Sequence, residues 1–90
     1  MKWYEIIKSI EKLLRERKLE SYQRFTELRE LDVLMRKYFP NIVDDPKLLL
    51  QRDKKEFKAK LERMMHKKLN GAEDSIVNNF YQIIESQKNL

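Results

Sequence analysis

The stretch "YFPNIVDDP", residues 38–46, divides this chain and decides its fold. Proline disfavours helical backbone in the residue before it, so a helix that reaches Tyr38 is expected to end ahead of Pro40. Asp45 and Pro46 then supply an N-cap and a proline at the first helical position, where its missing N–H costs nothing. A second cap-like signal, "DKKE" at residues 53–56, predicts a separate turn over 46–52 before a main helix over 54–69.

Two apolar stripes at helical spacing precede this boundary. Residues 2–16 form an amphipathic helix in this interpretation, and a second stripe runs from Phe25 to Phe39. Neither Gly nor Pro separates the stripes. Two alternatives follow: one helix that runs to about residue 38, or two helices with a break near Lys18 to Ser21 and Ser21 as N-cap. The break is the preferred alternative.

The segment after the main helix carries further helix signals. Gly71 can adopt a left-handed cap, so Asn70 and Gly71 are expected to close the helix. Asn70 can also cap the last helix, with Glu73 three residues on. Residues at the centres of their stripes should be buried. The residues expected to be buried on this ground are Phe57, Leu61 and Ile83.

The composition supports one small helical unit. The chain has 90 residues, with 41% hydrophobic and 39% charged side chains, and only one Gly and two Pro. So few helix breakers predict an all-α fold: a small bundle of three or four amphipathic helices in a single helical domain over 1–90. The absence of Cys excludes disulfides and thiolate metal sites. The longest aliphatic run, Leu48 to Leu50, is far too short to span a membrane, and the charged opening residues do not form a signal peptide, so a soluble cytoplasmic protein is expected.

The positive charge is concentrated in two segments. Of the formal net charge of +5, residues 53–69 contribute seven Lys and Arg against three Asp and Glu, and residues 1–18 contribute six against three. On a helix, Lys60, Arg63 and Lys67 line the side opposite the apolar residues. They are the candidate contacts for a partner or for phosphate groups. The alternative is a solvated helix face, with Glu56 and Lys60 paired four residues apart.

No catalytic or cofactor site is indicated. His66 is the only histidine, and it has no Cys or second His to complete a metal site or a nucleophile. Asp44 and Asp45 lack the EF-hand pattern, and no glycine-rich phosphate loop is present. We therefore expect a protein that is not an enzyme and that needs no cofactor or metal.

One short motif has a family resemblance. "ELDVLMRKY", residues 30–38, resembles the L-D-x-L-x-x-x-Y stretch of a family of small two-helix aspartyl-phosphate phosphatases. The resemblance covers about a tenth of the chain. Leu28 and Arg29 replace the Ser-Gln of that family, and the glycine-containing loop expected before the motif is missing. It is therefore set aside as ordinary helix content.

These observations favour a regulatory or adaptor protein that acts through protein–protein contacts. Self-association or a partner is expected because wide stripes that include Tyr38 and Phe39 leave apolar surface uncovered. The first alternative is a nucleic-acid-binding regulator that uses the basic helix 53–69. No zinc-finger, basic-zipper or RNA-binding motif accompanies that helix. The second alternative is a membrane-peripheral immunity-type protein that uses the basic amphipathic N-terminal helix.

Overall fold

The computed structural model describes residues 1–16, 22–69 and 75–88, and the ordered elements in these ranges are all helices. The elements, in chain order, are α1 (Trp3–Glu16), α2 (Tyr22–Tyr38), α3 (Pro40–Asp44), the 3₁₀ helix η1 (Pro46–Gln51), α4 (Lys54–Met65) and α5 (Ile76–Lys88). Four longer helices and two short ones therefore make up the described chain. The predicted all-α bundle is confirmed.

The boundary at residues 38–46 behaves largely as predicted. α2 ends at Tyr38, and η1 begins at Pro46. The structure adds a short helix that the sequence prediction missed. Phe39 leaves the helical region with φ −132° and ψ 53°, and Pro40 then occupies the first turn of α3. The proline that ends one helix therefore also starts the next, because its fixed φ suits a first helical turn.

α1 and α2 are separate helices, as the preferred two-helix alternative predicts. The break itself, including the predicted N-cap Ser21, lies outside the described residues. Among the other predicted caps, Asp53 accepts a hydrogen bond from the Glu56 N–H at 3.0 Å. Asp45 occupies the predicted N-cap position of η1 before Pro46, but its carboxylate makes no capping hydrogen bond there.

The main helix is shorter than predicted, because α4 ends at Met65 rather than at residue 69. His66 adopts the left-handed conformation with φ 55°, and its N–H donates to the Arg63 carbonyl at 3.3 Å. Glu62 then takes up the next N–H groups: its carbonyl accepts from Lys67 at 3.2 Å, and its carboxylate accepts from Leu69 at 2.7 Å. The predicted closing pair, Asn70 and Gly71, lies outside the described residues, as does Glu73.

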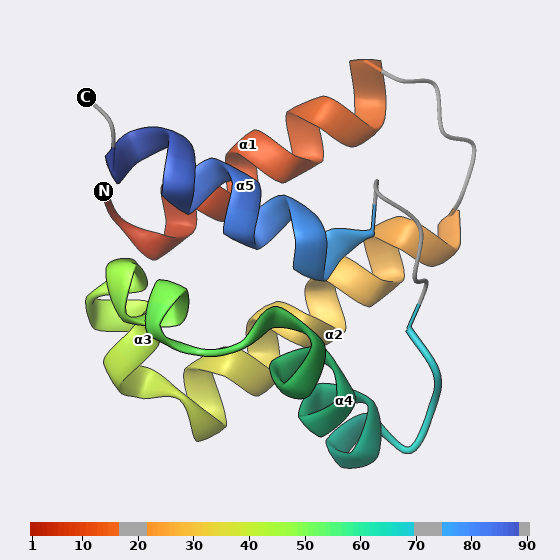
Figure 1. Cartoon of the computed structure of the whole chain (residues 1–90). Helices are drawn as coiled ribbons and strands as arrows, with labels where there is room; N and C mark the ends of the chain where they lie inside the picture. The colour runs from red at the N-terminus through yellow and green to blue at the C-terminus, as the bar shows by residue number, and fades with distance from the viewer. Residues whose placement is uncertain (17–21, 70–74, 89–90) are drawn as a thin grey trace.

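α5 occupies the centre of the molecule. It lies beside α1 and also packs against α2, α4 and η1 (Figure 1). The ring centroids of Trp3 and Phe80 are 5.1 Å apart across the contact between α1 and α5. At the start of α5, the Ser75 hydroxyl accepts from the Asn78 N–H at 3.2 Å, and thus caps the helix.

The buried core draws on every helix. Its apolar members are Trp3, Ile6, Ile7, Ile10, Leu14, Leu28, Leu31, Leu34, Met35, Phe39, Ile42, Leu49, Phe57, Leu61, Leu69, Ile76, Val77, Phe80, Tyr81 and Ile84. The predicted burial of Phe57 and Leu61 is confirmed. Ile83 is only half-buried, so its prediction is wrong; its neighbour Ile84 takes the core position. Within the described ranges, none of the helices has the length and apolar character needed to cross a bilayer.

Candidate functional site

The three basic residues singled out in the sequence do not lie on one helix. Lys60 and Arg63 lie on α4 and line a hollow near its start. Lys67 lies beyond the end of α4, and its ammonium pairs with the Glu30 carboxylate of α2 at 2.9 Å. The predicted stripe of three cations is therefore wrong in its geometry, because the helix that would align them ends before Lys67.

The hollow near the start of α4 holds charges of both signs. It has a volume of about 500 Å³ and is lined by Gln51, Arg52, Asp53, Glu56, Phe57, Ala59, Lys60 and Arg63. The Arg52 guanidinium lies 5.3 Å from the ring centroid of Phe39 and 5.2 Å from that of Phe57. The Lys60 ammonium lies 5.5 Å from the Phe39 ring. Arg52 and Lys60 thus lie against aromatic rings. The carboxylates of Asp53 and Glu56 line the same hollow.

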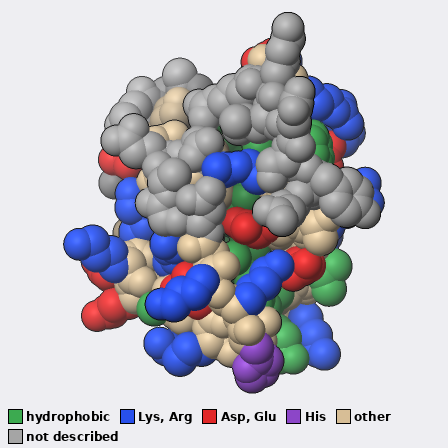
Figure 2. Space-filling view, turned by 90° about the vertical axis from the view of Figure 1, so that its right-hand side faces the viewer, with side chains coloured by type: hydrophobic (Ala, Val, Ile, Leu, Met, Phe, Trp, Pro, Cys, Tyr) green, Lys and Arg blue, Asp and Glu red, His purple; other side chains and the backbone are tan. Residues whose placement is uncertain are grey.

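Lys60 also lacks the partner expected from the sequence. Among the described residues its only close partner is the Phe39 ring, and Glu56 is not within ion-pair distance of it. Positive and negative side chains also alternate outside this hollow. Figure 2 shows a face on which Lys and Arg alternate with Asp and Glu, with the histidine at its lower edge. Among the described residues visible on that face, the basic side chains do not form a continuous surface.

A different surface combines apolar exposure with positive charge. We define the α2 patch as Arg29, Glu30, Val33, Leu34, Lys37, Tyr38 and Met65, which line a shallow hollow of about 480 Å³. Val33 is 65% exposed and Tyr38 is 54% exposed, among the highest values for large apolar side chains in the described chain. Leu34 is buried and Met65 is partly buried, so both connect this surface to the core.

Ion pairs around the α2 patch leave two of its cations uncompensated. Glu30 is engaged by Lys67, and the neighbouring Arg36 pairs with Asp32 at 2.9 Å. Within the part of the chain that the structure describes, Arg29 and Lys37 have no carboxylate within 4.0 Å. The Lys37 ammonium instead lies 5.2 Å from the Tyr38 ring centroid. The patch is therefore apolar at its centre and positive at its rim.

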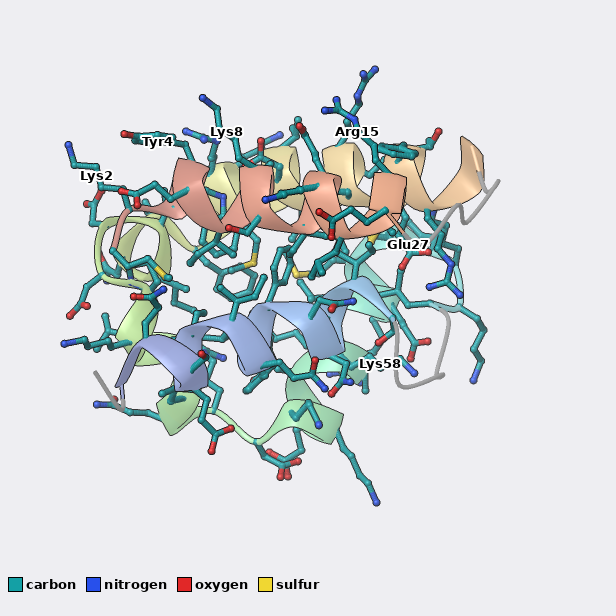
Figure 3. All side chains as sticks on the ribbon, turned by 90° about the horizontal axis from the view of Figure 1, so that it is seen from above. Lys2, Tyr4, Lys8, Arg15, Glu27 and Lys58 are labelled. Atoms are coloured by element: carbon teal, nitrogen blue, oxygen red, sulfur yellow. The ribbon has the colours of Figure 1, made fainter. Side chains whose placement is uncertain are left out.

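A charged cluster lies where α2 faces α4. Burial raises the pKa of the Glu27 carboxyl, and the positive charges of Lys67, Arg24 and Lys58 offset part of that rise. Figure 3 labels Glu27 and Lys58, which come from α2 and α4. These charges come from α2, from α4 and from the segment that follows α4, and we assign them to the packing of the bundle rather than to a binding site.

The N-terminal helix uses its apolar face inside the core. Trp3 is 2% exposed, and Ile6 and Ile10 are fully buried. Tyr4, Lys8 and Arg15 project from the outer side of α1, and Lys2 directly precedes this helix (Figure 3). An interfacial membrane helix would need the opposite arrangement, with its apolar face available to lipid.

Sequence reasoning missed the α2 patch. It noted Tyr38 and Phe39 as an apolar pair, but Phe39 is buried and only Tyr38 reaches the surface. An available signal was Val33, an apolar residue between Asp32 and Leu34 that falls outside the buried stripe of α2. The described residues hold no group of three or more His, Cys, Asp or Glu side chains that could bind a metal.

Comparison with known proteins finds no relative of this chain. No protein-family model, no curated protein and no solved structure matches this chain. A function must therefore be inferred from the residues and their geometry.

Proposed function

We propose that this helical protein is an adaptor or regulator that binds another protein through the α2 patch. The observation that carries the proposal is the exposure of Val33 and Tyr38 on one hollow whose floor belongs to the core. Single exposed apolar residues are common on protein surfaces, whereas a contiguous apolar area with a charged rim is typical of protein interfaces.

The packing around the patch supports a binding role. Leu34 and Met65 anchor the floor of the hollow, so the exposed side chains stand on a rigid helix rather than on a loop. A rigid surface loses little conformational entropy when a partner docks. Met65 adds an adaptable side chain that can adjust to the partner's shape.

The two alternative functions have weaker support. For nucleic-acid binding through residues 53–69, the cations would have to act together, but Lys67 pairs with Glu30 while Lys60 lies against Phe39. Asp53 and Glu56 would repel phosphate at the hollow where Arg63 lies. For membrane contact, α1 would have to withdraw its apolar face from the core.

The test is a pull-down from the native host with the wild-type protein and two variants. The first variant, Val33→Ser with Tyr38→Ser, removes the exposed centre of the α2 patch. The control, Tyr4→Ser, removes an aromatic ring of similar exposure from α1. We expect a protein partner that survives nuclease treatment, is lost with the first variant and is retained with Tyr4→Ser. Recovery that is unchanged by the first variant, or abolished by nuclease, would contradict the proposal.

A further inference from the structure

Two rows of side chains run along the side of α2 that lines the α2 patch. One row is Arg29, Val33 and Lys37, and the other is Glu30, Leu34 and Tyr38, with successive members four residues apart. Residues at this spacing lie nearly above one another on a helix. At a rise of 1.5 Å per residue, Arg29 and Lys37 are about 12 Å apart along the axis, with Val33 midway.

The charge along these rows is one-sided. Glu30 is the only acid of the α2 patch, and Lys67 already neutralises it at 2.9 Å. Arg29 and Lys37 have no such partner among the described residues. The apolar centre at Val33 is thus bracketed along the helix by two positive charges.

This arrangement disfavours a second copy of the chain as the occupant. An interface of two identical patches pairs residue i with residue j in both directions. With two antiparallel α2 helices centred on Val33, Arg29 would face Lys37 of the other copy. With two parallel helices, Arg29 would face Arg29. Like charges brought together at an interface are unfavourable, so the patch suits a partner of opposite charge.

We propose that the α2 patch binds an amphipathic helix of an acidic partner protein. An apolar side chain of that helix contacts Val33, and carboxylates four residues before and after it pair with Arg29 and Lys37. A helix fits because its residues four positions apart repeat at the spacing of the α2 rows, and the hollow beside Met65 receives its apolar face. The inference rests on the proposed function and specifies the partner's chemistry.

The test uses three fluorescein-labelled helical peptides with the full-length protein. All three peptides share a leucine face. They differ only at two positions, four residues before and four residues after the central leucine, where they carry Glu, Gln or Lys. Fluorescence anisotropy measures Kd at ~50 and ~200 mM salt. We expect the Glu peptide to bind at least about tenfold more tightly than the Lys peptide, and to weaken at higher salt.

Two variants show whether the named residues are responsible. Arg29→Glu with Lys37→Glu should reverse the preference toward the Lys peptide, and Arg29→Gln with Lys37→Gln should abolish it. Arg29 and Lys37 are both exposed, and circular dichroism verifies that the helices are retained. Val33→Ser should weaken binding of the Glu and Gln peptides alike.

Several results would overturn the inference. They are the absence of peptide binding, equal affinity for the Glu and Lys peptides, binding that ignores Val33→Ser, and a Val33-dependent dimer in sedimentation equilibrium. The proposed function fails on a different result, namely recovery of the host partner that Val33→Ser with Tyr38→Ser leaves unchanged. If the host partner is lost with Val33→Ser and Tyr38→Ser but kept with Arg29→Glu and Lys37→Glu, the docking function stands and the acidic-helix inference falls.

Discussion

One carboxylate oxygen of Asp32 accepts two hydrogen bonds, from the Trp3 indole N–H at 2.7 Å and from Arg36 Nε at 2.9 Å. A buried indole N–H without a partner is costly, so this contact fixes the first turn of α1 against the middle of α2. Asp32 belongs to the short motif that resembles the phosphatase family. Here it has a structural partner on another helix.

Leu61 tests the core at the scale of a single residue. It is fully buried on α4 and contributes to the central cluster. Leu61→Ala should lower the free energy of unfolding by roughly 2–5 kcal/mol, because the cavity adds to the lost transfer energy. Urea denaturation followed by circular dichroism measures the change.

Val33→Ala is the matched control, since it also truncates a branched side chain but at an exposed position. Its effect should stay within about 0.5 kcal/mol, as for ordinary surface substitutions. If both variants lose the same stability, the assigned orientation of α4 or of α2 is wrong.

Residue burial follows the apolar stripe on α4 but not on α5. Phe57 and Leu61 are buried as their stripe predicts. α5 instead packs against α1, α2, α4 and η1, so its buried side is wider than a stripe and is centred differently. For this reason Ile84 and Tyr81 are buried while Ile83 lies at the edge.

Among the helix starts, the two aspartates predicted as caps, Asp45 and Asp53, can be compared directly. Asp53 bonds the Glu56 N–H in the first turn of α4, whereas Asp45 makes no side-chain capping bond before η1. Asp53→Ala should cost about 0.5–2 kcal/mol, the usual range for loss of an N-cap. Asp45→Ala should cost clearly less. Thermal or urea unfolding of the two variants compares them, and equal losses would contradict the assigned caps.

The start of α4 could be predicted from the sequence, but its end could not. A capping Asp with Glu three residues later is a local signal. The end at Met65 depends on His66 adopting a left-handed conformation and on Glu62 accepting N–H groups from the segment beyond the helix. Histidine is not a strong signal for that conformation, and the sequence pattern alone favoured Gly71.

Tyr81 links α5 to the end of η1 and makes stability depend on pH. Its hydroxyl donates to the Arg52 carbonyl at 3.1 Å, and burial raises its pKa to about 12, against an opposing effect of Arg52. An unfolded tyrosine loses its proton near pH 10. Between about pH 10 and 12 the folded state therefore holds more protons, so the free energy of unfolding falls as pH rises.

Tyr81→Phe isolates this effect, because the other tyrosines and the lysines titrate in both proteins. Below pH ~9 the variant should be less stable by about 0.5–1.5 kcal/mol, through loss of one hydrogen bond. Above pH ~10 the difference should shrink and then reverse. Denaturant unfolding at several pH values measures it. A difference that stays constant up to pH ~11 would show that the Tyr81 hydroxyl is not held as described.

At the scale of the whole molecule, net charge along the chain was a poor guide to the surface. Residues 53–69 carry the largest excess of positive charge, yet folding places Glu30 against Lys67 and the Phe39 ring beneath Lys60. Glu30 belongs to α2 and Phe39 directly follows it, so both partners are distant in sequence from residues 53–69. Apart from Met65, the α2 patch lies within residues 19–52, where six Lys and Arg balance six Asp and Glu, so net charge along the chain did not point to it.

The last prediction concerns Lys60, Arg63 and Lys67 together. Replacing all three by Gln should change the free energy of unfolding by less than about 2 kcal/mol, because the exposed pair with Glu30 and the contact with Phe39 each contribute little. Anisotropy with labelled duplexes and single strands from ~50 to ~200 mM salt should show only weak binding, equal in wild type and variant. Weak binding that persists in the variant comes from cations elsewhere in the chain, since these are unchanged. A steep salt dependence in the wild type that flattens in the variant, by about 0.9 in log–log slope per lost duplex phosphate contact, would instead favour a nucleic-acid-binding function over the docking function.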